Sequence, residues 1–116
     1  MKMLHVTIQT NRFEEEMKFY QEVVGLKLSG DMRPRGKNLV FLSDEEGATA
    51  IEIIENPGAE NSGNENLSVG FKTDDVEAKR EELLAAGFEV TPMISPMPQV
   101  KFFFVKDPAG MRVQFM

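Results

Sequence analysis

The sequence contains no cysteine. This absence excludes disulfide bonds, thiolate zinc sites and cysteine nucleophiles, and it fits a reducing compartment. Histidine is also scarce, because His5 is the only one among 116 residues. A serine–histidine–aspartate triad would therefore have only His5 to use, and no serine lies in a nucleophile motif. A glycine-rich phosphate loop is missing as well.

Positive charge and long apolar runs are in short supply. Lys and Arg total 13 against 19 Asp and Glu, so the formal net charge is −6. This balance, without a basic stripe, argues against nucleic acid and anionic membranes as partners, and a cationic or neutral small molecule is easier to accommodate. The apolar run at 102–105 is too short to span a membrane, and the first ten residues do not form a secretory signal. We expect a cytoplasmic protein.

What the sequence does contain is an internal repeat. Residues 4–28 align with 67–90, and residues 39–54 align without gaps with 101–116. The alignment places His5 on Ser68, Glu52 on Gln114 and Phe41 on Phe103. Identities are few, but the order of sequence patterns is the same in both halves.

Each half is predicted to fold as β-α-β-β-β. Alternating apolar residues predict a first strand, a polar break and an amphipathic pattern predict a helix, and Gly25 or Gly87 follows as the residue that tolerates positive φ at the helix end. The apolar helix positions are Phe13, Met17, Tyr20 and Val24 in the first half, and Val76, Leu83 and Leu84 in the second. The remaining strands are expected at 26–28, 39–42 and 49–54, and at 88–90, 101–105 and 112–116.

These elements predict one α+β domain over residues 1–116. It consists of a module at 1–55, an exposed Gly/Asn-rich linker at 56–66 and a module at 67–116. Neither half is long enough to be stable comfortably alone, so we expect the modules to pair and form a concave eight-stranded trough, which is a natural small-molecule site.

Paired β-α-β-β-β modules resemble the vicinal oxygen chelate superfamily, which comprises glyoxalases, bleomycin-resistance proteins and extradiol dioxygenases. The resemblance covers nearly the whole chain. It rests on His5 in the first strand, Phe19-Tyr20 and Val24-Gly25-Leu26 around the end of the first helix, Ile51–Ile54 in the fourth strand, and Asp107-Pro108-Ala109-Gly110 before the last strand.

In metal-using members of this superfamily, four strand positions converge in the trough, and the resemblance carries these positions onto His5, Glu52, Ser68 and Gln114. It implies a divalent metal (Ni, Mn, Zn or Fe) on His5 and Glu52, with Glu52 as the catalytic residue. Imidazole and carboxylate are good ligands, whereas a serine hydroxyl and a glutamine carbonyl are weak ones. The set is incomplete, so the sequence leaves open whether a metal binds or His5 simply faces the trough beside Glu52.

Other residues are candidates for contact with a ligand. Ser68 and Gln114 could hydrogen-bond to it, and Phe102 and Phe104 could form a trough wall. Arg33 and Arg35 could recognise an anionic group or belong to a solvated hairpin tip. The Met- and Pro-rich segment 92–98 could line a pocket or form a dimer contact.

Two functions remain open at this point. The first is a small-molecule-binding protein of the bleomycin-resistance type without a metal. The second is a divalent-metal-dependent lyase or isomerase resembling glyoxalase I (lactoylglutathione lyase). Family likeness also implies a homodimer, with the trough either inside one chain or shared between two. The identity of the ligand cannot be read from these residues.

Overall fold

The computed structural model describes residues 1–61 and 63–116 and divides the chain into two compact units, Met1–Asn61 and Ser62–Met116. The first unit contains β1 (His5–Thr10), α1 (Phe13–Lys18), the π-helical η1 (Phe19–Val23), β2 (Lys27–Asp31), the 3₁₀ turn η2 (Arg33–Arg35), β3 (Leu39–Ser43) and β4 (Ala50–Glu55). The second contains β5 (Ser68–Phe71), α2 (Val76–Ala85), β6 (Ile94–Met97), β7 (Val100–Lys106) and β8 (Arg112–Phe115).

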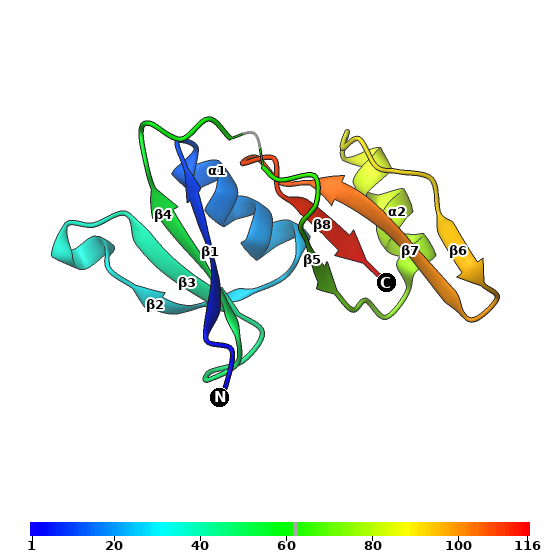
Figure 1. Cartoon of the computed structure of the whole chain (residues 1–116), viewed down its shortest axis with the longest axis horizontal. Coiled ribbons are helices and arrows are strands. Elements are labelled where there is room, and N and C mark those ends of the chain that lie inside the picture. Colours follow the sequence, from blue (N-terminus) through cyan, green and yellow to red (C-terminus); the bar gives the residue numbers. More distant parts are fainter. Residues whose placement is uncertain (62) are drawn as a thin grey trace. The chain divides into compact units, whose positions relative to one another are not determined.

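Each unit has one four-stranded sheet, and the two sheets have the same topology (Figure 1). The strand orders are β1-β4-β3-β2 and β5-β8-β7-β6. In both, the first strand of the unit pairs in parallel with the last, and the other pairings are antiparallel. This arrangement confirms the α+β class and the β-α-β-β-β order. No helix in the described residues is long and apolar enough to cross a membrane.

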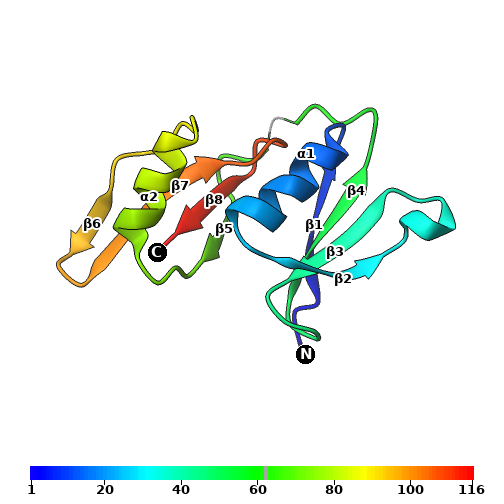
Figure 2. The same ribbon diagram turned by 180° about the vertical axis from the view of Figure 1, so that it is seen from behind.

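In the first unit, α1 covers one face of the sheet, as the opposite views of Figures 1 and 2 show. Along β1, Ile8 and Thr10 are buried, whereas His5, Thr7 and Gln9 are exposed. Because side chains alternate along a strand, the polar residues of β1 lie on the face away from the core. The core side chains on the helix and sheet include Phe13, Met17, Tyr20, Val40, Leu42 and Ile53.

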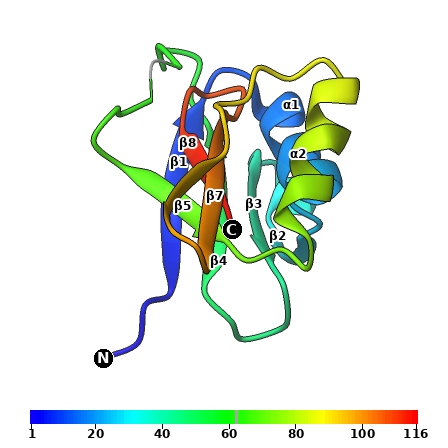
Figure 3. The same ribbon diagram turned by 90° about the vertical axis from the view of Figure 1, so that its right-hand side faces the viewer.

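In the second unit, α2 lies on one face of the sheet (Figure 3). The helix begins after Asp75, whose carboxylate accepts a hydrogen bond from the Ala78 N–H at 2.9 Å, an N-cap of the predicted type. Leu83 is buried, but Leu84 is 43% exposed, so its predicted place on the apolar side is wrong. Neighbouring helix residues point about 100° apart, and of these two it is Leu83 that is buried.

The segment after α2 also differs from the prediction. The expected strand at 88–90 is reduced to a single bridge between Val90 and Val105, and regular pairing resumes only in β6 at Ile94. Pro92 lies in the interruption, where its missing N–H prevents a continuous ladder.

The predicted linker at 56–66 is partly anchored. The Asn56 N–H donates to the Thr10 carbonyl at 2.8 Å, and the Asn11 side chain donates to the Ala59 carbonyl at 2.9 Å. The Thr10 hydroxyl also donates to the Asn61 side-chain oxygen at 2.9 Å. Residues 56–61 are therefore held against the end of β1, and the boundary between the two units falls inside the predicted linker.

Candidate functional site

The first unit brings His5 and Glu52 together on the sheet face away from α1. Thr7 lies opposite Glu52 in the parallel β1–β4 pair, and His5 precedes Thr7 on the same face of β1. The His5 Nε2 atom is 3.4 Å from the Glu52 Oε1 atom. The imidazole is 37% exposed and the carboxylate only 12%. A ligand on this face would thus meet the imidazole first, with the carboxylate behind it.

The Glu52 carboxylate is held by a second neighbour. The Thr7 hydroxyl donates a hydrogen bond to Glu52 Oε1 at 2.5 Å. Glu52 lies in a strand between the buried residues Ile51 and Ile53, where an unsolvated carboxylate is costly. Hydrogen bonds to a charged acceptor are short and offset part of that cost.

An aromatic wall borders this pair. Phe41 lies opposite Glu52 in the β3–β4 pair, and its ring meets the His5 ring edge-on, with centroids 5.6 Å apart. Gly30 leaves room for the Phe41 ring, because a Cβ atom at Gly30 would come 2.9 Å from the ring's Cδ2 atom. The site in the first unit therefore combines an imidazole, a carboxylate, a hydroxyl and one phenyl face.

The second unit repeats this backbone register with different side chains. In the first unit the pairs are His5 with Ala50, and Thr7 with Glu52. The corresponding pairs of the second unit are Ser68 with Arg112, and Gly70 with Gln114. The structural counterparts of His5, Thr7 and Glu52 are therefore Ser68, Gly70 and Gln114.

The register also corrects the ungapped alignment. Phe41 pairs with Glu52, and Phe104 pairs with Gln114, so the counterpart of Phe41 is Phe104. Phe103 instead lies on the opposite face and is fully buried in the core. The alignment was wrong here because the β7–β8 hairpin is one residue shorter than the β3–β4 hairpin.

Ser68 and Gln114 have fewer polar neighbours than His5 and Glu52. Ser68 is exposed, and Gln114 is half-buried over Gly70, where a Cβ atom would lie 3.1 Å from the Gln114 Oε1 atom. Gly70 has no hydroxyl to match that of Thr7. Within residues 1–61 and 63–116, the side chains of Ser68 and Gln114 form no hydrogen bond to the protein, so both are available to a ligand.

Phe102 and Phe104 line the same face of the second sheet. Both are half-buried, and their rings meet edge-on with centroids 5.8 Å apart. The Arg112 guanidinium lies over the Phe104 ring at 4.3 Å from its centroid, and Arg112 Nη1 donates to the Glu65 carbonyl at 3.0 Å. This face is therefore aromatic and positively charged, in contrast to the carboxylate of the first unit.

Arg33 and Arg35 lie in η2, between β2 and β3. The Arg33 guanidinium donates two hydrogen bonds to the Asp31 carboxylate, at 2.9 and 2.7 Å, and these bonds lower the pKa of Asp31 to about 2. The two-pronged fork of Arg33 is thus already occupied by a carboxylate of the chain. Arg35 is exposed, and no described residue pairs with it.

The donor chemistry of these positions does not fit a tightly held divalent metal. His5 and Glu52 supply one imidazole and one carboxylate, while the family's two remaining positions hold a hydroxyl and an amide. Among the described residues there is no group of three or more His, Cys, Asp or Glu side chains that could hold a metal ion. A metal at this site would lack the third strong ligand that catalytic zinc sites have.

Sequence reasoning missed three residues of these faces. Thr7 and Arg112 each lie two positions from a candidate residue in the same strand, and Phe41 lies opposite Glu52. Side chains of residues i and i+2 lie on the same face of a strand, so the sequence pattern could have identified Thr7 from His5 and Arg112 from Gln114. Phe41 required the strand register, which the sequence does not specify.

Comparison with known proteins identifies the family. The family model "Glyoxalase/Bleomycin resistance protein/Dioxygenase superfamily" matches residues 2–115. A lactoylglutathione lyase of Haemophilus influenzae is 31% identical over 124 residues, which cover 100% of this chain and 92% of the relative.

Solved structures show the same fold. A possible glyoxalase from Bacillus cereus has a TM-score of 0.77 at 24% identity, covering 100% of this chain and 98% of the other. TnmS3, an antibiotic binding protein from a Streptomyces species, has a TM-score of 0.76 at 19% identity, covering 99% and 93%. The chain belongs to the glyoxalase/bleomycin resistance protein/dioxygenase superfamily, also called the vicinal oxygen chelate superfamily.

Proposed function

We propose that this chain is a small-molecule-binding member of its superfamily and does not carry out the lactoylglutathione lyase reaction. One observation carries the proposal. The β5–β8 pair repeats the register of the β1–β4 pair, but Ser68, Gly70 and Gln114 occupy the positions of His5, Thr7 and Glu52. Of the four positions that the family resemblance assigns to metal ligands, two therefore hold a serine hydroxyl and a glutamine amide.

The replaced groups matter for the chemistry. Isomerisation of a hemithioacetal, the reaction of glyoxalase I, moves a proton between carbon atoms and needs a group that accepts and returns it. The amide of Gln114 and the hydroxyl of Ser68 do not titrate near neutral pH. Both groups can form hydrogen bonds to a carbonyl or hydroxyl of a ligand that is bound and then released without reaction.

The alternative is a metal-dependent lyase in which Glu52 is the catalytic residue. The 3.4 Å approach of His5 Nε2 to Glu52 Oε1 favours this candidate, as does the 31% identity to a lactoylglutathione lyase. A homodimer, which the family likeness implies, belongs to either proposal, and sedimentation velocity of the purified chain would test it.

An activity assay separates the two functions. The purified chain would be incubated with the hemithioacetal of methylglyoxal and glutathione in the presence of Ni, Mn, Zn or Fe, and lactoylglutathione formation would be followed. We expect no turnover above that of Glu52→Gln under any of these conditions. Metal-dependent turnover that disappears in both His5→Ala and Glu52→Gln would contradict the binding-protein proposal.

A further inference from the structure

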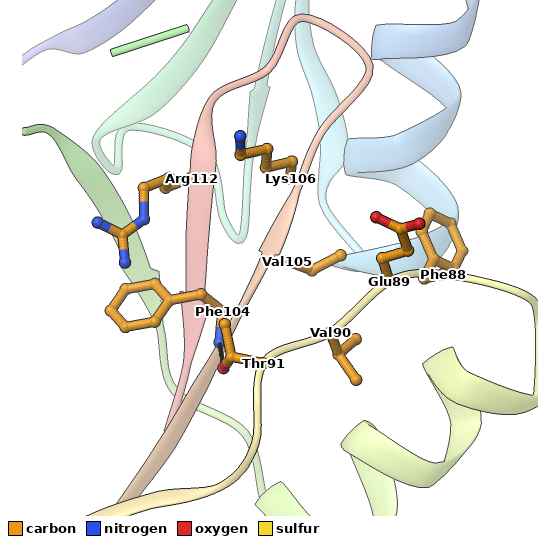
Figure 4. A pocket seen from close by; sticks show the side chains of 8 residues that line it. All are labelled: Phe88, Glu89, Val90, Thr91, Phe104, Val105, Lys106 and Arg112. Atoms are coloured by element: carbon orange, nitrogen blue, oxygen red, sulfur yellow. Dashed lines mark hydrogen bonds between the residues drawn. The ribbon is translucent and has the colours of Figure 1, made fainter. Parts of the chain in front are cut away.

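The second unit contains a cavity that the sequence did not predict. It has a volume of about 440 Å³, which is within the range of roughly 300–1,000 Å³ that is typical of ligand pockets. All of its lining residues belong to the second unit: Phe88, Glu89, Val90, Thr91, Phe104, Val105, Lys106 and Arg112 (Figure 4).

The cavity lies beside the interruption of the strand ladder described above. The segment 88–91 is fixed to β7 by the Val90–Val105 bridge. The Phe104 N–H donates to the Thr91 hydroxyl at 2.9 Å, and the Thr91 N–H donates to the Phe104 carbonyl at 3.0 Å. The Thr91 hydroxyl thus takes the place of a backbone acceptor. Segment 88–91, which forms one wall of the cavity, therefore stays fixed to β7 although the regular strand pairing is interrupted there.

The charges around the cavity differ from those of the chain as a whole. The chain carries a net charge of −6, but the lining has Lys106 and Arg112 against the single carboxylate of Glu89. In Figure 4, Arg112 and Phe104 lie on one side of the cavity and Glu89 on the other. The charged side chains of the lining therefore sum to a net positive charge, opposite in sign to that of the chain.

The two cations of the lining differ from those cations of the chain that are held in ion pairs. Arg12, Arg33 and Lys101 each form an ion pair with a carboxylate. By contrast, neither Arg112 nor Lys106 has an ion-pair partner among the residues that the structure describes. Arg112 is held over the Phe104 ring and by the Glu65 carbonyl, which leaves most of its five N–H donors free.

We propose that this cavity binds a small molecule with an anionic group attached to an aromatic or other apolar body, and that Arg112 and Lys106 hold the anion. Phe104, Phe88 and Val90 offer apolar surface for the body, and the guanidinium offers a planar fork that suits a carboxylate. The inference rests on the proposed binding function and names the ligand class. It departs from the cationic or neutral ligand that net charge alone favours.

Naphthoate, naphthalenemethanol and naphthylmethylammonium are the probes for the test, because they share a ring system and differ in charge. Binding would be followed by calorimetry and by backbone amide NMR shifts. We expect naphthoate to bind at least about tenfold more tightly than either other probe, since hydrogen bonds between charged groups are roughly twice as strong as those between neutral groups. The amide shifts should centre on residues 88–91 and 104–106.

Amino-acid substitutions test whether naphthoate binds in this cavity. Arg112→Gln and Lys106→Gln should each weaken naphthoate binding, the former by about tenfold, and Glu89→Gln should strengthen it by about twofold. The matched control is Lys72→Gln, which removes one positive charge from an exposed position of the same unit. Lys106 is exposed, so its variant keeps the test valid should Arg112→Gln unfold.

Three results would overturn the inference: equal binding of naphthoate and the alcohol, equal losses in Lys106→Gln and Lys72→Gln, or no naphthoate binding at millimolar concentration. None of them depends on metal or turnover. Metal-dependent turnover would instead overturn the proposed function, so the two failures are distinguishable.

Discussion

In the first unit, Thr7 and His5 surround a buried carboxylate on Glu52, whereas in the second unit Gly70 and Ser68 flank the amide of Gln114. The backbone register is the same in both. At these positions the difference therefore lies in the side chains. One sheet presents a carboxylate, and the other presents an aromatic ring under a guanidinium. A duplicated fold can thus keep its hydrogen-bonded frame while its two halves take on different ligand chemistry.

The largest expected effect tests the register that underlies this comparison. Phe103 is fully buried, so Phe103→Ala should lower the free energy of unfolding by about 3–5 kcal/mol. Phe41 is half-buried on the His5 face, and Phe41→Ala should cost less than half as much. Denaturant unfolding of the two variants measures both. Equal losses would restore the ungapped alignment, in which Phe41 and Phe103 are counterparts.

A smaller effect on the free energy of unfolding is expected from substitutions of Thr7 and of its counterpart Gly70. Thr7→Val keeps the side-chain shape but removes the donor to a buried carboxylate, so it should cost about 1–3 kcal/mol in the free energy of unfolding. Gly70→Ser adds a hydroxyl near the flexible end of Gln114, and we expect a change within about 0.5 kcal/mol. Similar losses in both variants would show that the carboxylate in the first unit has no special dependence on Thr7.

The smallest effect compares a surface ion pair from each unit. Arg33 lowers the pKa of Asp31 to about 2, and the hydrogen bond from Lys101 lowers the pKa of Glu77. A depressed pKa in the folded state stabilises at pH values above the unfolded pKa, about 3.9 for Asp, and this contribution disappears as the pH falls toward 2. The stability difference between the wild type and Asp31→Asn should therefore shrink across that window.

NMR titration of the side-chain carboxyl carbons checks this directly. Arg33→Gln should return the titration of Asp31 to the ordinary range and leave Glu77 unchanged. A midpoint for Asp31 near 3.9 in the wild type would contradict the account.

Much of the fold followed from the sequence. The repeat predicted two β-α-β-β-β units, and Gly25 and Gly87 do adopt positive φ, +87° and +89°, after their helices. The predicted alternation of the first strand is also present, with Ile8 buried and Thr7 and Gln9 exposed. These predictions succeeded because strand period, helix ends and turn residues are local properties.

The errors in the sequence predictions arose where the structure of a segment depends on contacts with segments far away in the chain. The ungapped alignment made Phe103 the counterpart of Phe41. It could not detect that the β7–β8 hairpin is one residue shorter than the β3–β4 hairpin, because hairpin length depends on how the strands pair. Residues 88–90 form one bridge because the segment detaches around Pro92. The stacking of Arg112 on Phe104 needed three-dimensional contact, although both residues lie on strands that the sequence predicted.

The central claim is that the side chains of the second unit leave the metal-ligand set incomplete, and metal affinity tests it most directly. Ni, Mn, Zn and Fe would be titrated calorimetrically into the wild type, His5→Ala, and the double variant Ser68→His with Gln114→Glu. We predict weak binding to the wild type and at least about a hundredfold tighter binding to the double variant, because all four positions that the family resemblance assigns to metal ligands would then hold strong donors. Tight stoichiometric binding to the wild type that is lost in His5→Ala would contradict the account.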